Sequence, residues 1–365
     1  MATCYAASAA GVLVVRGLRR PADGADSDAD RPAPTADHTL DRDDVECLDA
    51  APGAPDRVLC GTLEGGLLRS TDAGDSWARV GEPTLPASVT SVTVSPTDPD
   101  VVYAGTEPSA VYRSTDGGAT WTALSELTDL PSAGEWSFPP RPHTHHVRWI
   151  EVDPADPDHL YVAVEAGALV QTRDGGDSWT ERAVSARRDT HSMAIHPDAP
   201  GVVRAAAGDG YAESRDGGET WAHPQAGLHH RYCWSVAVDP GDPGRGLVSA
   251  AAGARPAHTP SSASSHLYRL VDGTGRGNRP RGGADAPRAG WERLDDVGVP
   301  TGEGVLRATL AGGRDAGAFL ALTDRGLFRS RDGGDRFRRV DVAWPAAFRD
   351  RPTRGLAVVE SPEGL

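Results

Sequence analysis

The chain has 365 residues, with 52 acidic and 37 basic side chains and a net charge of -15, and every basic residue is an arginine. This acidic excess argues against nucleic acid and anionic membrane surfaces as partners. The four cysteines lack the close spacing of a metal-binding motif, so we expect buried, reduced thiols. The lack of lysine beside many Asp and Ala residues suggests a high-GC organism, either a haloarchaeon or a soil bacterium.

At the N-terminus, alternating apolar residues in 4–16 predict two β-strands, and this segment is similar in sequence to 59–69. Residues 17–43 are rich in Asp, Ala, Pro and Arg, which is typical of a flexible acidic insertion. The first residues include no basic start and no run of about 20 apolar residues. We therefore expect a cytoplasmic protein.

Further along the chain, one short motif occurs five times, with the order Ser or Thr, x, Asp, x, Gly, x, x, aromatic residue. An Asp two residues before a Gly favours a tight turn, because the carboxylate accepts backbone N–H bonds and Gly adopts a positive φ. Strand-like segments such as 101–106 and 110–114 precede the motif. Each copy is therefore predicted to be a hairpin turn with a structural aspartate. These aspartates are Asp72, Asp116, Asp174, Asp216 and Asp332.

The motif resembles the Asp-box, or BNR, repeat of sialidases, xyloglucanases, sortilin-type receptors and a photosystem II assembly factor. This resemblance implies a β-propeller in which the box joins the third and fourth strands of each blade. In that family the box is structural, so the resemblance implies a fold and leaves the chemistry open. The box tryptophans are then expected to pack between blades.

The spacing of the boxes predicts the number of blades. The box aspartates are 44, 58, 42 and 116 residues apart, and a four-stranded blade takes about 40–45 residues. The long gap therefore contains one eroded blade, for which 235–240, 266–272 and Trp291 supply the matching segments. Residues 354–362 resemble a first strand and 4–16 lack one, so joining them would close the ring and remove exposed edges. We predict a single all-β domain over 1–365, a seven-bladed propeller closed by its terminal strands, with six blades as the alternative.

The loops that enter the innermost strands of a propeller gather at one mouth of its central channel, where ligands commonly bind. Residues 125–146 form a long insertion rich in aromatic residues, His and Pro, which we expect to fold over this mouth. Two further long loops are expected in the sixth blade, at 253–265 and 273–289.

Period-two alternation along the inner strands selects the side chains that should face the channel. At the mouth the predicted set is polar or aromatic: Asp44, Glu46, Ser88, Thr90, His146, Arg148, Asp189, His191, Tyr232 and Trp234. Deeper positions on the same strands are apolar: Val92, Ile150, Met193 and Val236. The channel is therefore predicted to be polar at its mouth and apolar inside.

These side chains favour three kinds of site. His146, His191 and Asp189 offer the imidazole and carboxylate ligands that suit a divalent metal such as Zn, Mn or Fe. Alternatively, Asp189, His191 and Glu46 are candidate catalytic groups for acid–base work on an anion. Ligand contacts are predicted for His143, His145, His146, Arg148, Trp136, Tyr232 and Trp234. The alternative to all of these is a ring of polar side chains that only holds water.

Two functions remain open from the sequence. The first is a monomeric binding module that recognises a small anion, a glycan or a protein at its loop-bearing face. The second is a hydrolase or lyase, glycosidase-like or metal-dependent, that uses the cluster at the mouth. The Phe/Tyr-Arg-Ile-Pro motif of sialidases is missing, and xyloglucanases pair two propellers where this sequence predicts one. A glycosidase would need two of the carboxylates of Asp44, Glu46 and Asp189 about 5–9.5 Å apart.

Overall fold

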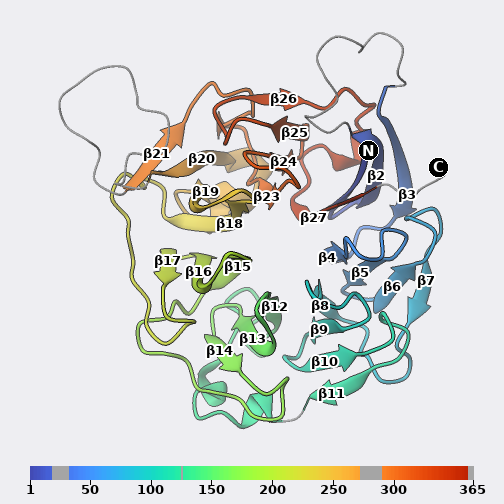
Figure 1. Ribbon diagram of the computed structural model, residues 1–365, viewed down its shortest axis with the longest axis vertical. Coiled ribbons are helices and arrows are strands. Elements are labelled where there is room, and N and C mark those ends of the chain that lie inside the picture. Colours follow the sequence, from blue (N-terminus) through green and yellow to red (C-terminus); the bar gives the residue numbers. More distant parts are fainter. Residues whose placement is uncertain (19–32, 125, 272–289, 361–365) are drawn as a thin grey trace.

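The computed structural model describes residues 1–18, 33–124, 126–271 and 290–360, and over these residues the strands form seven sheets arranged as a ring around a central channel (Figure 1). Neighbouring strands within each sheet are antiparallel and follow one another in the sequence, except that the last strand of the chain pairs with the first and one short strand joins its sheet out of sequence order. The prediction of an all-β, seven-bladed propeller is confirmed.

The blades are numbered from the N-terminus, and each is given from its inner strand outward. Blade 1 contains β27 (Thr353–Glu360), β1 (Ala2–Ser8), β2 (Gly11–Leu18) and β3 (Thr35–Asp41). Blade 2 contains β4 (Val45–Ala50), β5 (Val58–Thr62), β6 (Leu67–Ser70) and β7 (Ala78–Val80). Blade 3 contains β8 (Val89–Val94), β9 (Val102–Thr106), β10 (Val111–Ser114) and β11 (Thr122–Leu124).

Blades 4 and 5 have three strands each, with an isolated bridge in the outer position. Blade 4 contains β12 (Val147–Asp153), β13 (Asp156–Val164) and β14 (Ala168–Thr172). Blade 5 contains β15 (Thr190–His196), β16 (Ala199–Ala207) and β17 (Gly210–Ser214). The bridges pair Gln171 with Thr180 and Glu213 with Ala222.

Blade 6 contains β18 (Tyr232–Asp239), β19 (Asp242–Ala251), β20 (Ser264–Val271) and β21 (Gly290–Leu294), and β22 (Gly302–Glu303) also pairs with β20. Blade 7 contains β23 (Thr309–Gly312), β24 (Phe319–Thr323), β25 (Gly326–Ser330) and β26 (Phe337–Arg339). The eroded blade is therefore present where the sequence placed it, and its Trp291 is 6% exposed.

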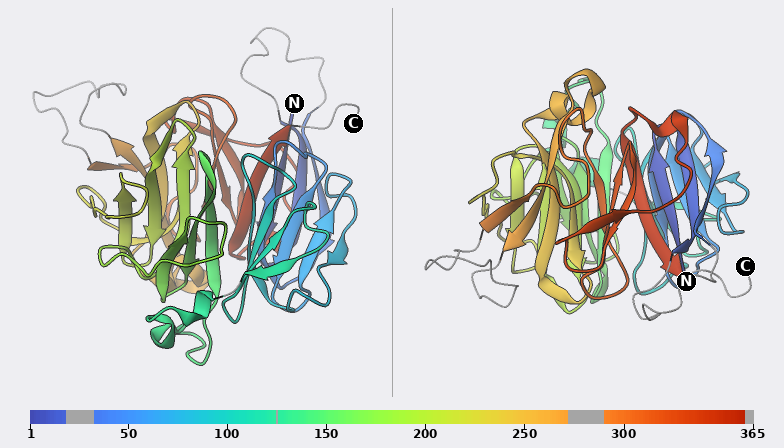
Figure 2. Two further views of the ribbon diagram at one scale, coloured as in Figure 1. Left: turned by 60° about the horizontal axis from the view of Figure 1, so that its bottom comes forward. Right: turned by 90° about the horizontal axis from the view of Figure 1, so that it is seen from above.

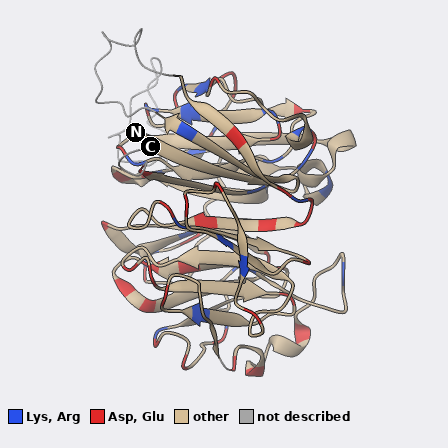
Figure 3. Cartoon of the chain, turned by 90° about the vertical axis from the view of Figure 1, so that its right-hand side faces the viewer, with Lys and Arg blue, Asp and Glu red and all other residues tan. Residues whose placement is uncertain are grey.

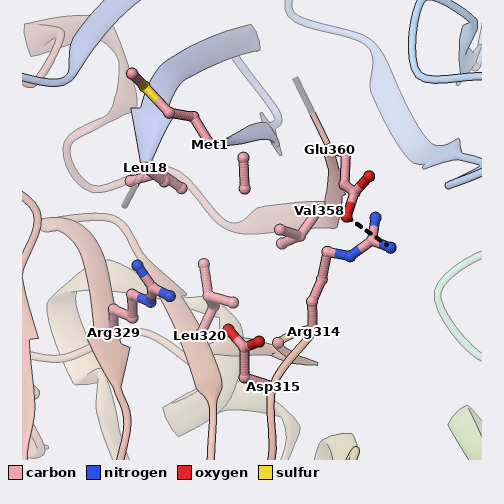
Figure 4. Close-up of a pocket in the computed structure, with 10 residues that line it drawn as sticks. Met1, Leu18, Arg314, Asp315, Leu320, Arg329, Val358 and Glu360 are labelled. Atoms are coloured by element: carbon pink, nitrogen blue, oxygen red, sulfur yellow. Dashed lines mark ion pairs between the residues drawn. The ribbon is translucent and has the colours of Figure 1, made fainter. Parts of the chain in front are cut away.

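The ring closes through the two ends of the chain. Strand β27 pairs antiparallel with β1, from Ala2 opposite Glu360 to Ser8 opposite Thr353, as the terminal segments predicted. At one end of this seam, Arg314 of blade 7 forms an ion pair with Glu360 at 3.4 Å, beside a cavity of about 20 Å³ (Figure 4). That volume is close to the space of a single water molecule, so we interpret this cavity as a small packing gap at the seam.

The range predicted for the flexible insertion, 17–43, overlaps strands at both of its ends. Strand β2 continues to Leu18, and β3 at Thr35–Asp41 pairs with β2 as the outer strand of blade 1. The composition misled because the outer strand of a blade is largely solvated, and polar residues are compatible with such a strand. Residues 19–32 of the predicted insertion lie outside the described residues.

Two segments between strands stand on the same face of the ring, opposite the two chain ends (Figure 2). One is the segment before β12, which contains the short 3-10 helices η2 (Leu127–Asp129) and η3 (Ala133–Glu135). The other joins β19 to β20 and folds as α1 (Ala254–His258) and η4 (Pro260–Ser262), where the sequence predicted only a loop. The loop predicted at 273–289 lies outside the described residues. A last 3-10 helix, η5 (Ala346–Phe348), precedes β27.

The hydrophobic core lies between neighbouring blades. Trp121, for example, packs with Leu59 of blade 2 and Val89 of blade 3, and Trp221 packs with Tyr161 and Leu169 of blade 4. The box tryptophans therefore pack between blades, as expected. Helices are so short that none in the described part of the chain could cross a membrane. Figure 3 shows acidic and basic residues interspersed along one side of the ring.

The Asp boxes are hydrogen-bonded turns in every copy. In the box of blade 3, Asp116 accepts the Ser114 hydroxyl at 2.7 Å and the Thr120 backbone N–H at 2.9 Å, and Gly118 has a φ of 86°. Hydrogen bonds of the same kind, first of all from the Thr220 hydroxyl, lower the pKa of Asp216 to about 2. In all five boxes the aspartate accepts a hydrogen bond from the first hydroxyl of its own turn.

Candidate functional site

The mouth of the channel, defined here as the end at which the inner strands begin, is shaped by a repeated backbone irregularity. Six inner strands skip one residue in their pairing with the second strand, close to their first residue. A β-bulge of this kind leaves the extra residue outside the ladder and redirects its side chain. The skipped residues are Glu46, Thr90, Arg148, His191, Trp234 and Arg354.

The bulges also correct the predicted channel interior. Val92, Ile150, Met193 and Val236 line the channel as predicted, but the extra residue shifts the alternation by one, and the Ile150 and Met193 side chains also pack in the cores between blades, at 0% and 2% exposure. The channel encloses about 370 Å³, and its lining includes the acidic residues Asp49 and Glu151. The period-two alignment predicted an apolar channel interior. The lining instead includes acidic side chains as well as apolar ones.

His191, Asp189 and Glu165 form a compact group at the mouth. The His191 Nε2 atom lies 3.6 Å from Asp189 Oδ1 and 3.9 Å from Glu165 Oε1. One ligand atom from each residue lies within 4.8 Å of the other two. Asp189 and His191 were predicted, whereas Glu165 was missed because it lies in the turn between β13 and β14 rather than on an inner strand.

His146 supports Glu165. The His146 Nε2 and Glu165 Oε2 atoms are 2.9 Å apart, and the side chains of both residues are largely buried. Burial alone would raise the pKa of the Glu165 carboxyl, but the His146 hydrogen bond and the charges of His146, His191 and Arg148 hold it well below its usual value. Glu165 is therefore a carboxylate, and a candidate ligand rather than a proton donor.

Three arginines converge beside this group. The Arg148 guanidinium lies 3.9 Å from both Glu46 and Glu165, and its carbon lies 4.6 Å from the centre of the Trp234 ring. The Arg307 guanidinium lies 3.5 Å from the same ring, and Arg354 pairs with Glu46 at 3.0 Å. Burial lowers the pKa of Arg307 well below its usual value, and the positive charges of Arg354 and Arg148 lower it further.

A hydrogen-bond chain of fixed direction runs from Arg307 to Tyr232. Arg307 donates from Nε to His258 Nδ1 at 3.1 Å, and His258 Nε2 lies 3.0 Å from the Tyr232 hydroxyl. Because a guanidinium can only donate, His258 must carry its proton on Nε2 and donate it to the Tyr232 oxygen. Burial and the Arg307 charge lower the pKa of His258 to about 2, so its ring is neutral. The Tyr232 hydroxyl hydrogen is thus directed away from His258.

Several buried nitrogens at the mouth have no hydrogen-bond partner among the described residues. We call five of them the open nitrogens: His146 Nδ1, Arg148 Nε, His191 Nε2, Arg307 Nη2 and Arg354 Nε. Buried polar groups are nearly always hydrogen-bonded, because leaving one unpaired costs about 1–3 kcal/mol. A cluster of such groups in one place indicates space for a ligand, an ion or water.

Of the residues in the insertion at 126–146 that were predicted to contact a ligand, only His146 lies in this site. Phe138 packs edge-on against His146 with ring centres 4.7 Å apart, and Arg141 ties the segment to Glu107 with a 3.0 Å hydrogen bond. His143 is exposed, and His145 contacts Trp136 at 5.7 Å.

Trp136 was predicted to contact a ligand, but the structure places it in the core. It is 5% exposed and belongs to the core between blades 3 and 4, so its ring offers no face to a ligand. A large aromatic residue in a loop can equally well anchor that loop to the core, and the sequence pattern does not distinguish the two roles.

The remaining predicted residues divide between the site and its surroundings. Tyr232 and Trp234 pack against His191, with ring centres 5.0 and 4.6 Å away, and Glu46 holds Arg354. Asp44 forms hydrogen bonds of 2.8 Å with Arg42 and therefore belongs to the blade 2 surface. Thr90 donates to the Val147 carbonyl at 2.7 Å, a contact that joins blades 3 and 4.

Comparison with known proteins agrees with the repeat and the ring. The BNR/Asp-box repeat matches residues 112–123, which end β10 and begin β11 around Asp116. The chain is a seven-bladed β-propeller that contains a BNR/Asp-box repeat. No curated protein matches its sequence.

Several solved structures share the fold of this Asp-box propeller. A GH74 xyloglucanase from Xanthomonas campestris is 19% identical, with a TM-score of 0.61, 97% of this chain covered and 52% of that one. An ancestral GH74 enzyme is 15% identical, with a TM-score of 0.58 and coverages of 87% and 38%. YCF48 bound to a D1 peptide is 15% identical, with a TM-score of 0.55 and coverages of 82% and 81%. The propeller thus spans about half or less of these GH74 enzymes, and at such identities the likeness concerns the fold alone.

Proposed function

We propose that this Asp-box propeller is a binding module for a small anion, one bearing a carboxylate, phosphate or sulfate group, at the mouth of its channel. The observation that carries the proposal is the set of open nitrogens, four of which belong to side chains that are at most 6% exposed. Arginine donors of this kind suit carboxylate and phosphate oxygens, since the guanidinium offers several N–H groups in one plane.

The charges at the mouth support the same assignment. Three guanidinium groups lie close enough to affect one another, and the carboxylates of Glu46 and Glu165 neutralise them only in part, at distances of 3.0 to 3.9 Å. An added anion would relieve this repulsion and accept the unpaired N–H groups of Arg148, Arg307 and Arg354. The Tyr232 hydroxyl, which His258 leaves free to donate, would supply one more hydrogen bond to the same ligand.

The alternative is a hydrolase or lyase at the same mouth. It is favoured by the close approach of the Glu165 and Asp189 carboxylates, whose nearest ligand atoms lie within 4.8 Å of each other. Retaining glycosidases place their two carboxylates about 5–5.5 Å apart, but one of the two must be protonated. The low pKa of Glu165 makes it unsuited as the proton donor and leaves that role to Asp189, which is 31% exposed, and so we favour the binding module.

Calorimetric titration of the metal-free protein with phosphate, sulfate, acetate and citrate tests the proposal. Substituting Arg148→Met should weaken binding about 10- to 150-fold, because one hydrogen bond to a charged group contributes roughly 1.5–3 kcal/mol. The matched control is Arg173→Met, which removes an arginine that is 47% exposed and pairs with Glu219 away from the mouth. Equal affinity of wild type and Arg148→Met for every anion, or no binding by wild type, would contradict the proposal.

A further inference from the structure

The geometry points to a second site within the mouth, in the group formed by Glu165, Asp189 and His191. Their nearest atoms are separated by 3.6 and 3.9 Å, which is too long for hydrogen bonds. Two ligands each about 2.1 Å from a metal ion lie roughly 3.0–4.2 Å apart for bond angles between 90° and 180°. Both distances from His191 fall in this range, and the nearest ligand atoms of Glu165 and Asp189 lie within 4.8 Å of each other.

The orientation of His191 is that of a metal ligand. Its Nδ1 atom lies 2.7 Å from the Cys233 carbonyl oxygen, which can only accept, so Nδ1 carries a proton and Nε2 is the nitrogen left to bind an ion. His191 is 1% exposed, and within the described chain its Nε2 has no hydrogen-bond partner. Histidines that bind metals almost always donate the other N–H to a carbonyl or carboxylate in this way.

Both carboxylates are held in place by neighbours. Glu165 contacts His146 through Oε2, so that Oε1 faces His191. Asp189 accepts the backbone N–H of Ala166 at 3.1 Å through Oδ1, the same oxygen that faces His191, and a carboxylate oxygen has a second lone pair for an ion. Ala166 has a φ of 54°, an unfavourable conformation for a residue with a Cβ, and it follows Glu165 in the turn. The turn is strained at the point where it supplies one ligand and positions another, as strained backbone at functional sites commonly does.

We propose that Glu165, Asp189 and His191 bind one divalent transition-metal ion, of the Zn²⁺ or Mn²⁺ type. One imidazole and two carboxylates are donors that these ions accept, and three protein ligands leave a coordination position open. His146, which the sequence offered as a ligand, instead orients Glu165 from behind. The open position would face the anion site, so a bound anion could contact both the ion and Arg148. The metal site stands on its own contacts and does not require the anion site.

Titration of chelator-treated protein with ZnCl2 and with MnCl2, in buffer without phosphate or carboxylates, tests this site. Wild type should bind one ion per chain, and bound Mn²⁺ should change its electron paramagnetic resonance spectrum. Asp189→Asn and His191→Gln should abolish this binding. His146→Gln should weaken it about 10- to 100-fold, the usual loss when a group behind a metal ligand is changed.

The matched control is Asp209→Asn, in the neighbouring turn between β16 and β17. The Asp209 side chain is 52% exposed and pairs with Arg187 at 3.0 Å, so this variant should bind the ion as wild type does. If His191→Gln does not fold, Asp189→Asn decides, because that side chain is 31% exposed. The proposal is overturned if wild type binds neither ion, or if folded Asp189→Asn binds as tightly as wild type. Anion titration of metal-free protein remains a separate result.

Discussion

The Asp-box turns and the mouth of the channel lie at opposite ends of the blades, and they differ in how completely their polar atoms are hydrogen-bonded. In all five boxes the first hydroxyl donates to the aspartate and accepts the backbone N–H of the second glycine position. At the mouth, by contrast, the six bulged positions of the inner strands carry five residue types, Glu, Thr, His and Trp once each and Arg twice. Their open nitrogens have no such partners.

This difference in hydrogen bonding distinguishes a structural part of each blade, the box turn, from a part whose residues vary between blades, the bulged position. The box is the same in each blade because it completes its own hydrogen bonds and needs nothing from outside. The bulged positions are equivalent in space but not in chemistry, and three of them, Arg148, His191 and Arg354, have a nitrogen without a hydrogen-bond partner in the described chain. Buried groups left incomplete by the fold are where a functional site is expected, since the fold tolerates such a cost mainly at such places. Substitutions at the two ends should therefore have different consequences.

The largest expected effect on stability is at a box hydroxyl. Ser114→Ala removes a hydroxyl that is 2% exposed, accepts the Gly118 N–H at 2.9 Å and donates to Asp116. The Gly118 N–H would be left without its partner, so the free energy of unfolding should fall by about 1–3 kcal/mol. Denaturant unfolding monitored by tryptophan fluorescence measures this change, while anion and metal titrations should be unaffected. A loss well below this range would mean that water replaces the hydroxyl, and the contrast with the mouth would weaken.

At the mouth, Arg148→Met should change stability much less. Arg148 makes ion pairs only at 3.9 Å, and its partners have better contacts of their own: Glu46 with Arg354, and Glu165 with His146. Replacing a weakly paired buried charge by an apolar side chain of similar length is often neutral or stabilising. The free energy of unfolding should therefore stay within about 1 kcal/mol of wild type, or rise, even though anion binding is lost. A drop of several kcal/mol would show that Arg148 is structural.

Much of the fold was accessible from the sequence because a repeated motif fixes the period, and the period fixes the number of blades. The closure of blade 1 followed in the same way, since its strands resemble those of blade 2 and lack a first strand. His146, Arg148, Asp189, His191, Tyr232 and Trp234 were found because the inner strands can be aligned on one another. The pattern is local, and local patterns are what a single sequence records well.

The rest of the site depends on contacts between segments far apart in the chain. Glu165 lies in a turn, His258 lies on α1 within a predicted loop, and Arg307 precedes β23. No periodicity relates these positions to the inner strands. The bulge was also missed, although small residues follow the bulged position in several blades, at Cys47, Ser91, Ser192 and Ser235. That recurrence is the one signal in the sequence that could have corrected the alignment.

The smallest expected effect concerns pH, and it compares the two regions through their carboxyl groups. Hydrogen bonds lower the pKa of Asp72 and Asp216 in the boxes to about 2. Burial in the channel does the opposite to Glu151, raising its pKa to about 8, with a further increase from the charge of Asp49. A group with a lowered pKa stabilises the fold above its unfolded-state pKa and loses that contribution as the pH falls. Glu151 contributes stability at low pH and loses it as the pH rises from about 4.5 to 8.

Glu151→Gln removes this titration while keeping the shape and the hydrogen bond from Trp149, which lies at 2.7 Å in wild type. Between pH 5 and 8 the stability of wild type should fall relative to that of the variant, by less than about 1.4 kcal/mol per pH unit, the limit for one proton. The variant keeps the titrations of Asp49, whose pKa burial raises to about 6, and of the histidines whose pKa burial lowers, such as His258. Below pH 4 both proteins should lose stability in parallel, because the box aspartates are unchanged. Denaturant unfolding across this pH range measures both slopes. Identical slopes between pH 5 and 8 would mean that the Glu151 carboxyl is solvated in the channel and that burial does not raise its pKa.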